Sequence, residues 1–378
     1  MSKTLKVGIA GGRGLSTLLG FKSIEGVEVA AMCDLDEALL ERVSKEHNIP
    51  KTYRVFDDMM ESDIDAVVIA TPMQCHVPQA IAALEAGKHV LSEVTAGVTM
   101  DELWWLKESV EKSGKTYMYA ENYCYMPYCQ QIRQMVRQGL FGEVYYGECE
   151  YLHNVTGLMV YPNGKTSWRT YWQLGKRGNF YPTHSLGPMM QWFEGDRVRS
   201  VSCFSAGHHN GLRQDDTTVT MCQTDAGKLI KLRVDCTSPR PHNMTGYQLQ
   251  GTKGAFESAR EYGPGAGKNI VWLDSMGESV DRAKWRNLAD LSEYLPERYR
   301  KATEEQNHAG HGGGDFFLVQ DFVDAIREGK KPDIDIYQAC EWTAVGLLSE
   351  LSVMNGGKTI DVPNFRTAKT FADQEIKL

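Results

Sequence analysis

The sequence predicts an α/β domain with a parallel sheet, followed by an α+β domain with an open, mostly antiparallel sheet. Short apolar runs alternate with segments of helical spacing up to residue 123, a pattern typical of βαβ units. A glycine-rich loop joins the first apolar run to the first helix. From residue 124 onward, runs of alternating polar and apolar residues follow one another, which favours a separate sheet. We therefore predict domains at 1–123 and 124–378.

The first domain contains apolar runs of strand length at Leu5–Ala10, Val27–Cys33, Ala66–Ala70, His89–Leu91 and Thr116–Ala120. Segments of helical spacing separate these runs at Leu15–Lys22, Glu37–Glu46, Val77–Ala86 and Met100–Ser113. Nearly continuous apolar strands are typical of a sheet that is covered on both faces. A doubly covered parallel sheet is therefore expected.

The second domain begins with an amphipathic helix over Met126–Gln138. Strand-like alternation follows at Val144–His153, Val198–Ser205, Thr217–Thr224, Lys228–Asp235, Tyr247–Gly251 and Asn269–Leu273. Two helices, Phe316–Glu328 and Tyr337–Val353, complete the chain, with Pro332 between them.

Composition narrows the class of protein. The chain has 378 residues, 42% of them hydrophobic and 24% charged, as in ordinary soluble proteins. A net charge of −8 argues against binding to nucleic acid or an anionic membrane. Residues 1–10 lack the features of a signal peptide, and no apolar run is long enough to cross a membrane. These observations predict a cytoplasmic protein.

The nine cysteines include no C-x-x-C pair, which argues against a zinc knuckle or a disulfide scaffold. The adjacent His208 and His209 have no third ligand near them in the sequence. We therefore predict reduced thiols and no metal site.

The glycine loop consists of Gly11, Gly12, Arg13 and Gly14. It departs from G-x-G-x-x-G, because Thr17 stands at the last glycine when the pattern starts at Gly12. Its position between a strand and a helix nevertheless favours binding of a pyrophosphate. Arg13 either contacts that pyrophosphate or points into solvent. Asp34 ends the second strand and is placed to bind a ribose 2′-hydroxyl, which favours NAD over NADP. The alternative is a structural turn beside a surface aspartate.

Four segments resemble the Gfo/Idh/MocA family of NAD(P)-dependent sugar oxidoreductases. They are KVGIAGGRG (6–14), CDLD (33–36), the segment 67–94 and GLFGEVYYGE (139–148). The resemblance implies a Rossmann NAD-binding domain and an open, mostly antiparallel sheet domain that carries a sugar site under the nicotinamide. It also implies a homo-oligomer, either a dimer or a tetramer.

Two departures from that family concern its catalytic base. Most members have Glu-Lys-Pro where this chain has Glu93-Val94-Thr95, and many have an aspartate where this chain has Phe180. The usual lysine and aspartate are therefore both missing.

A second resemblance is closer and is consistent with the missing lysine and aspartate. The chain resembles glycoside hydrolase family 109, the NAD-dependent α-N-acetylgalactosaminidases. The similar segments are ENYCYM (121–126), YLHN (151–154), Trp168-Arg169, GNFYPTHSLGP (178–188), TSPRP (237–241), HGGGDF (311–316) and DIYQACEWTA (335–344).

This resemblance implies that Tyr181 and His184 lie on either side of the reacting carbons. A neutral histidine can take a hydroxyl proton near pH 7. A tyrosine has a pKa of about 10 and needs a cationic neighbour, for which Arg169 is the candidate. Arg169 is also expected to bind sugar hydroxyls, and Tyr151 to contact the substrate. The alternatives are a hydrogen-bonded core histidine and structural tyrosines.

Ligands bind at the carboxyl edge of an open parallel sheet. Glu121 ends the fifth predicted strand and is expected to bind a sugar hydroxyl or the nicotinamide ribose, or to cap the next helix. His76 is expected to position the nicotinamide side of the pocket without taking part in the chemistry. The remaining predicted cofactor contacts are Thr71, Pro72, Glu93 and Asn122.

Three functions follow from these residues. The first is a redox-assisted glycosidase that oxidises a sugar at C3, eliminates the aglycone and recycles its NAD. The second is a net sugar dehydrogenase that releases a 3-keto sugar, and the third is a non-catalytic NAD-binding regulator. The missing lysine counts against the second, and the Tyr181, His184 and Arg169 set counts against the third. The first is therefore our prediction.

Overall fold

The computed structural model describes residues 3–241, 243–260, 267–277 and 280–368, which divide into two compact units. Within these residues the first unit comprises 3–125 and 302–340, and the second comprises 126–301 and 341–368. The sequence predicts one break after residue 123, whereas the segment 302–340 groups with the first unit. Its helix α11 (Gly314–Glu328) packs against α1 (Leu18–Lys22) and against the turn that follows the last parallel strand. No helix in these residues is long and apolar enough to cross a membrane.

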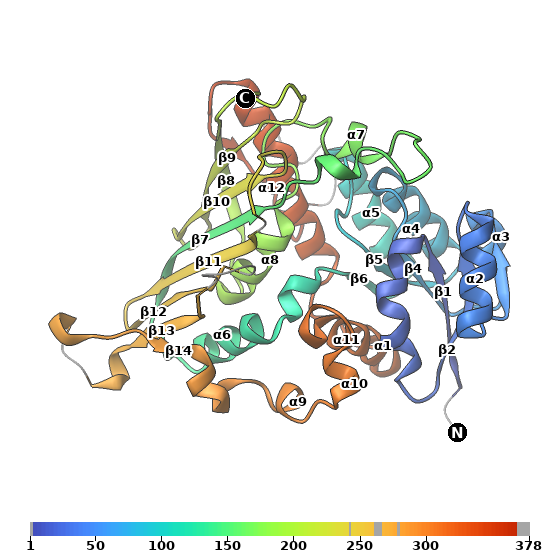
Figure 1. Cartoon of the computed structure of the whole chain (residues 1–378), viewed down its shortest axis with the longest axis horizontal. Coiled ribbons are helices and arrows are strands. Elements are labelled where there is room, and N and C mark those ends of the chain that lie inside the picture. Colours follow the sequence, from blue (N-terminus) through green and yellow to red (C-terminus); the bar gives the residue numbers. More distant parts are fainter. Residues whose placement is uncertain (1–2, 242, 261–266, 278–279, 369–378) are drawn as a thin grey trace. The chain divides into compact units, whose positions relative to one another are not determined.

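The first unit is built on a six-stranded parallel sheet in the order β3-β2-β1-β4-β5-β6 (Figure 1). Its strands are β1 Leu5–Ala10, β2 Val27–Cys33, β3 Lys51–Tyr53, β4 Ala66–Ile69, β5 His89–Ser92 and β6 Tyr117–Tyr119. The five predicted strands are confirmed. The strand order reverses between β1 and β4, and this is where such sheets bind ligands.

Helices connect these strands and complete the unit. They are α1 Leu18–Lys22, α2 Glu37–His47, α3 Phe56–Met60, α4 His76–Glu85, α5 Met100–Ser113, α10 Glu304–Asn307 and α11 Gly314–Glu328, with 3-10 turns η1 Gly12–Thr17, η2 Met73–Cys75, η3 Asn122–Tyr125 and η8 His311–Gly313. Local sequence explains the ends of α2, because Asp36 caps its first turn and Asn48 closes it in the left-handed conformation. Helix α12 Ile336–Met354 begins in this unit and ends in the second.

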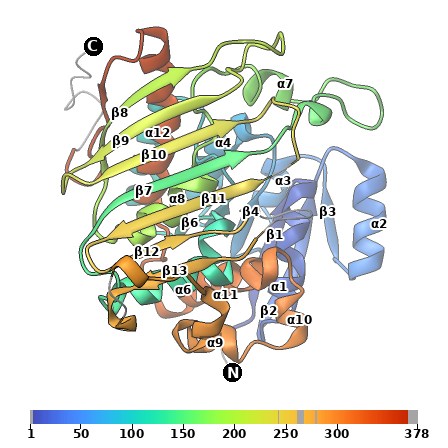
Figure 2. The same cartoon turned by 60° about the vertical axis from the view of Figure 1, so that its left-hand side comes forward.

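The second unit is built on a nine-stranded sheet in the order β14-β13-β12-β11-β7-β10-β9-β8-β15, which Figure 2 shows face-on. Only the β7–β10 pair is parallel, so the predicted, mostly antiparallel sheet is confirmed. Its strands are β7 Val144–Leu152, β8 Val198–Ser205, β9 Thr218–Thr224, β10 Leu229–Asp235, β11 Met244–Gly251, β12 Gly254–Glu257, β13 Ile270–Leu273, β14 Arg286–Asn287 and β15 Ile360–Asp361.

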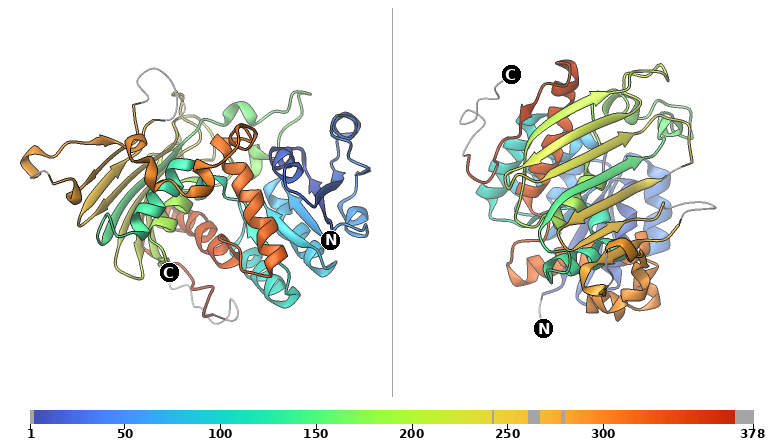
Figure 3. Two further views of the ribbon diagram at one scale, coloured as in Figure 1. Left: turned by 90° about the horizontal axis from the view of Figure 1, so that it is seen from below. Right: turned by 90° about the vertical axis from the view of Figure 1, so that its left-hand side faces the viewer.

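Helices α6 and α8, teal and light green in Figure 3, lie along one face of this sheet. A Cβ at Gly147 of β7 would stand 2.3 Å from the Met189 sulfur of α8, so the glycine permits this close approach. The remaining helices and 3-10 turns are α6 Pro127–Arg137, α7 Arg169–Trp172, α8 Thr183–Trp192, α9 Glu297–Arg300, η4 Thr156–Leu158, η5 Asp274–Met276, η6 Val280–Arg282 and η7 Leu288–Tyr294.

The stretch 178–188 differs from the turn that its glycines and prolines suggest. Helix α8 begins at Thr183 and contains Pro188 in its interior. Proline has no N–H, so the carbonyl of His184, four residues earlier, loses its helical donor. The hydroxyl of Tyr247 on β11 donates to that carbonyl at 2.5 Å and replaces the missing bond. A contact from a distant strand thus allows a helix where the local sequence indicates a turn.

We expect Tyr247→Phe to remove this donor from the partly buried His184 carbonyl. The free energy of unfolding should fall by about 1–3 kcal/mol, as is usual for a buried unsatisfied polar group. Chemical denaturation measures this loss, and Tyr145→Phe, at a 46% exposed tyrosine of β7, is the matched control. Equal stability of the two variants would contradict this role for Tyr247.

Candidate active site

The glycine loop of the first unit passes closely over the ends of β1 and β4. Gly11 has a φ of 92°, and a Cβ there would stand 2.3 Å from the Ala70 carbonyl oxygen. A Cβ at Gly14 would stand 2.7 Å from a methyl group of Ile9. The Thr17 hydroxyl donates to the Gly14 carbonyl at 2.7 Å, at the position where the full motif has its last glycine. Arg13 is exposed.

Asp34 ties this loop to the end of β2. Its Oδ2 accepts from the Gly12 N–H at 2.7 Å, and its Oδ1 accepts from the Asp36 N–H at 2.9 Å. A carboxylate oxygen can accept more than one hydrogen bond, so both atoms keep capacity for a ribose hydroxyl. Asp34 therefore has a structural role that does not exclude cofactor binding.

His76 connects the segments that follow β4 and β5. Its Nδ1 lies 2.8 Å from the Thr95 carbonyl oxygen, and its Nε2 lies 2.8 Å from that of Thr71. Burial lowers the pKa of His76, although its carbonyl partners oppose this effect. Both ring nitrogens are occupied by backbone, so the geometry suits a positioning residue. Pro72 and Glu93, on the two segments, are partly exposed at the same edge of the sheet.

Glu121 and Asn122 follow β6 directly. Glu121 is fully buried, and its Oε1 accepts from the Tyr123 N–H at 3.3 Å. The Asn122 side chain is 93% buried and donates from Nδ2 to Oδ1 of Asp315 at 3.2 Å. Its own carbonyl oxygen has no hydrogen-bond partner in the described residues.

This edge of the sheet suits a dinucleotide in two respects. A Cβ at Gly11, Gly12 or Gly14 would stand within 3.0 Å of a neighbouring atom, so the glycines hold the loop close over the edge of the sheet where a pyrophosphate binds. The buried oxygen of Asn122 is an acceptor that a ribose hydroxyl would satisfy.

The second unit brings four rings together. The Tyr181 and His184 rings are 5.1 Å apart, and the Tyr151 ring lies 5.5 Å and 5.3 Å from them. The Tyr151 hydroxyl is 2.7 Å from Nδ1 of His153. Tyr181 and His184 are partly exposed, whereas Tyr151 is buried. We call Tyr151, His153, Tyr181 and His184 the aromatic cluster. The sequence prediction missed His153, although two-residue alternation places it on the same face as Tyr151.

Arg169 begins α7 and stacks on the neighbouring Trp168, with its guanidinium carbon 4.5 Å from the ring centroid. It also donates to the Gln173 side chain. Burial raises the pKa of Cys236 to about 12, and the nearby Arg169 charge opposes the rise. In the described residues Arg169 makes no hydrogen bond to Tyr181, so direct contact does not supply the cation expected there.

Asp215 fixes the backbone that leads to Tyr181. Its Oδ2 accepts from the Gly178 N–H at 2.6 Å, and its Oδ1 accepts from the Arg177 guanidinium at 3.0 Å. Burial by itself would raise the pKa of Asp215, but hydrogen bonds from Arg177, Ser205 and Gly178 lower it overall. No sequence motif points to this residue, because its partners lie far away along the chain.

His208 and His209 belong to the same loop region. Nε2 of His208 is 3.5 Å from Asp215, and Nε2 of His209 is 2.9 Å from the Ala206 carbonyl oxygen. Throughout the described ranges, no group of three His, Cys, Asp or Glu side chains is arranged to hold a metal.

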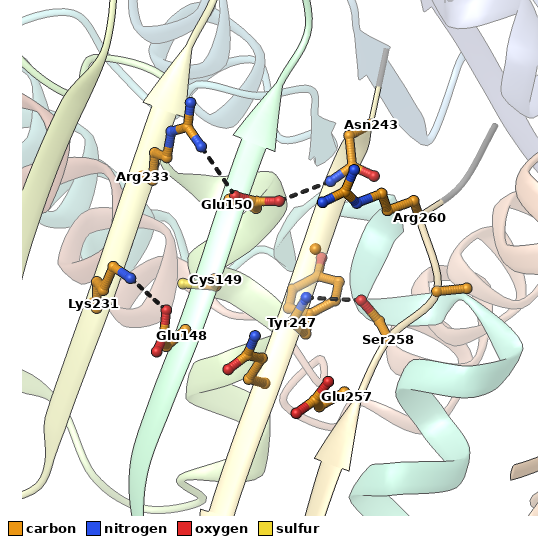
Figure 4. A pocket seen from close by; sticks show the side chains of 13 residues that line it. Glu148, Cys149, Glu150, Lys231, Arg233, Asn243, Tyr247, Glu257, Ser258 and Arg260 are labelled. Carbon is orange, nitrogen blue, oxygen red and sulfur yellow. Dashed lines mark hydrogen bonds and ion pairs between the residues drawn. The ribbon is translucent and has the colours of Figure 1, made fainter. Parts of the chain in front are cut away.

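A pocket lies over polar side chains of β7, β10 and β11 (Figure 4). Glu148 pairs with Lys231 at 2.6 Å, and Glu150 accepts from Asn243 at 2.8 Å. Even-numbered residues of β7 point away from the face that carries Tyr151. This pocket is therefore distinct from the aromatic cluster.

Two protein families match the chain. The family described as "Glycosyl hydrolase 109, C-terminal domain" matches residues 125–372. The family described as "Oxidoreductase family, NAD-binding Rossmann fold" matches residues 5–121. The second match confirms NAD as the predicted cofactor.

Similar proteins cover almost the whole chain. The "Glycosyl hydrolase family 109 protein" of Shewanella sp. (strain W3-18-1) is 35% identical over 94% of this chain and 83% of the relative. The "Alpha-N-acetylgalactosaminidase" of Shewanella oneidensis is 34% identical over the same shares. A solved structure of levoglucosan dehydrogenase with NADH and levoglucosan has a TM-score of 0.79 and 20% identity, covering 95% of this chain and 99% of that one. The family matches and the two relatives support an NAD-dependent enzyme that acts on a sugar, and the solved structure supports the fold.

The carboxylate of Asp34 predicts a preference for NAD over NADP. Asp34→Asn keeps an acceptor for the Gly12 N–H but removes the charge that repels a 2′-phosphate, so we expect the ratio of the two dissociation constants to shrink about tenfold. Fluorescence titration with each cofactor measures the ratio, with Asp57→Asn, an exposed aspartate of α3, as the control. An unchanged ratio would show that Asp34 serves only the loop.

Proposed function

This chain belongs to glycosyl hydrolase family 109, and we propose that it hydrolyses a glycoside by transient oxidation of the sugar at C3. The aromatic cluster is the observation that carries the proposal. It places a tyrosine and a histidine side by side in a chain that lacks the lysine of Glu-Lys-Pro. The cluster holds acid and base groups but no carboxylate. The proposed reaction therefore does not use the paired carboxylates of ordinary glycosidases.

NAD, when bound, supplies a hydride acceptor for the C3 carbinol and afterwards returns the hydride. The residues that we assign to holding it are the loop Gly11, Gly12, Arg13 and Gly14, together with Asp34, Thr71, Pro72, Glu93 and Asn122. His76 keeps the two segments that contribute Thr71 and Glu93 at a fixed separation.

We assign the proton of the C3 hydroxyl to His184, because a neutral imidazole can accept it near pH 7. A C3 ketone acidifies the neighbouring C2–H, and Tyr181 is the base assigned to that proton. The bond between C1 and the aglycone oxygen then breaks by elimination, and water adds back at C1. The C3 hydroxyl and C2 each give one proton to a named side chain, as general acid–base catalysis requires. The departing aglycone oxygen takes up one proton, and the added water supplies the hydroxyl at C1 and the proton at C2.

The charge on Tyr181 needs stabilisation while it acts as a base. Arg169 makes no direct hydrogen bond to Tyr181, so we assign Arg169 to binding sugar hydroxyls or an anionic substituent. The neighbouring imidazole, protonated after it accepts the C3 proton, is the cation that Tyr181 contacts. Tyr151, oriented by His153, and Glu121 are assigned to the substrate.

The net sugar dehydrogenase is the runner-up. The levoglucosan dehydrogenase likeness supports the fold alone, and Val94 stands where the family's lysine assists net oxidation. The name of the Shewanella oneidensis relative makes an α-N-acetylgalactosaminide the first substrate to test. The cytoplasmic location and the dimer or tetramer stay predictions.

We expect the protein to release nitrophenol from one of a panel of p-nitrophenyl α- and β-glycosides without net formation of NADH. Absorbance of nitrophenol and of NADH, recorded together with and without added NAD, separates the alternatives. Stoichiometric NADH without nitrophenol would contradict the proposal and favour the dehydrogenase. Bound NAD with no reaction on any sugar would favour the regulator.

The double substitution Tyr181→Phe with His184→Ala tests whether the aromatic cluster carries out the acid/base chemistry. Turnover should fall by at least about a thousandfold, since one acid/base group contributes about 10²–10⁴. NAD affinity should stay unchanged, because both residues belong to the second unit. Tyr161→Phe, at a 41% exposed tyrosine, is the control.

A further inference from the structure

A polar cluster in the first unit joins Asn122, which is assigned to NAD above, to His311 and Asp315, which have no part in the function proposed above. His311 of η8 places its Nδ1 3.0 Å from both carboxylate oxygens of Asp315 in α11. Asn122 of η3 donates to the same carboxylate at 3.2 Å, and the His311 ring lies 5.8 Å from the ring of Tyr123. Asp315 is only 4% exposed, so these hydrogen bonds form in a buried setting. We call His311, Asp315 and Asn122 the His311 cluster.

The backbone around His311 explains the run of glycines in HGGGDF. His311 has a φ of 46°, and Gly310, Gly312 and Gly313 have φ values of 93°, 64° and 89°. Such angles suit glycine and are uncommon for other residues. A Cβ at Gly310 would also stand 2.4 Å from a carboxylate oxygen of Asp315. The segment is thus shaped to bring the imidazole onto Asp315.

Two polar atoms of the cluster have no hydrogen-bond partner in the described residues. Nδ1–H of His311 donates to Asp315, while Nε2 makes no hydrogen bond in the described ranges, and the His311 side chain is 29% exposed. The side-chain oxygen of Asn122, in a residue that is 93% buried, also has no partner there. A protonated imidazole is a donor at Nε2, and an amide oxygen is an acceptor. A ligand with phosphate or ribose oxygens and a free hydroxyl would satisfy both.

The charged groups around His311 belong to the cofactor edge of the sheet. Asp315 of α11 raises the pKa of His311, and burial opposes this rise. The charge of Arg13 lowers the same pKa, and the charge of Glu93 raises it. Arg13 is in the glycine loop and Glu93 follows β5. Helix α11, which carries Asp315, contacts the turn η1 in which the glycine loop continues, so the His311 cluster lies near residues assigned to NAD within the same unit.

We propose that His311, oriented by Asp315, is a further NAD contact whose Nε2 donates to a phosphate or ribose oxygen, while the Asn122 side-chain oxygen accepts from a ribose hydroxyl. The proposal rests on NAD as the cofactor of this chain. His311 binds and does not react, so its contribution is to cofactor affinity. NAD is then bound most tightly when the imidazole is protonated.

The proposal predicts that NAD affinity falls as pH rises. The pKa of His311 is raised above its ordinary value of about 6.5, so the imidazole stays protonated up to and somewhat beyond that pH. NAD affinity is therefore fully present below about pH 6.5 and falls as pH rises through the raised pKa.

The test is the dissociation constant of NAD, measured by calorimetry from about pH 6 to pH 9 on the full chain. His311→Gln keeps a hydrogen-bonding side chain without the titrating charge. We expect it to weaken NAD binding about tenfold at the acidic end and to abolish the decline of affinity with pH. His308→Gln, at an exposed histidine of the same segment, should behave as the unmodified protein.

Asp315→Asn is the second variant. It preserves shape but removes the charge that favours the imidazolium, so the midpoint of the affinity decline should move to lower pH. Thermal melts establish that each variant is folded. Folded variants with the affinity and pH profile of the unmodified protein would overturn the proposal. Failure of the unmodified protein to bind NAD would instead overturn the assignment of the cofactor.

Discussion

A proline inside a helix sets the position of the histidine on which the proposed chemistry depends. Pro188 removes the donor that would hold the His184 carbonyl within α8, and the Tyr247 hydroxyl on β11 replaces it. The first turn of the helix is therefore attached to the sheet, and α8 packs closely over Gly147 of β7. The His184 ring consequently lies beside Tyr151, which the same strand carries.

Each unit carries a different part of the proposed function. The parallel sheet of the first unit, with its glycine loop and Asp34, matches an NAD-binding family. The mostly antiparallel sheet of the second unit carries the aromatic cluster and matches the family 109 domain. The lysine and aspartate of the wider oxidoreductase family are missing, and the acid/base groups that we propose in their place, Tyr181 and His184, belong to the second unit. This division predicts that cofactor binding and proton transfer can be altered separately.

Much of the fold follows from local sequence. Apolar runs such as Ala66–Ile69 identify the buried parallel strands, since only strands covered on both faces are apolar throughout. The strand β3 Lys51–Tyr53 escapes prediction because it is short and its side chains are largely exposed. The helix α8 escapes prediction because the donor that permits Pro188 is 63 residues away from its acceptor.

The candidate site shows the same limit. Tyr181 and His184 can be identified from one segment, and their contact is local. The His311 cluster joins Asn122 to Asp315 across 193 residues, so no spacing rule reveals it. Asp215 likewise supports Gly178 from 37 residues away. Long-range hydrogen bonds, which depend on the folded chain, therefore account for most of what the sequence does not indicate.

Transient oxidation at C3 is the central claim, and a glycoside labelled with deuterium at C3 tests it most directly. Hydride transfer should slow release of the aglycone by a primary isotope effect, and the released sugar should keep its deuterium at C3 because the same cofactor returns it. Release at the same rate from labelled and unlabelled glycoside, with no solvent deuterium at C2 of the sugar released in deuterium oxide, would contradict the account.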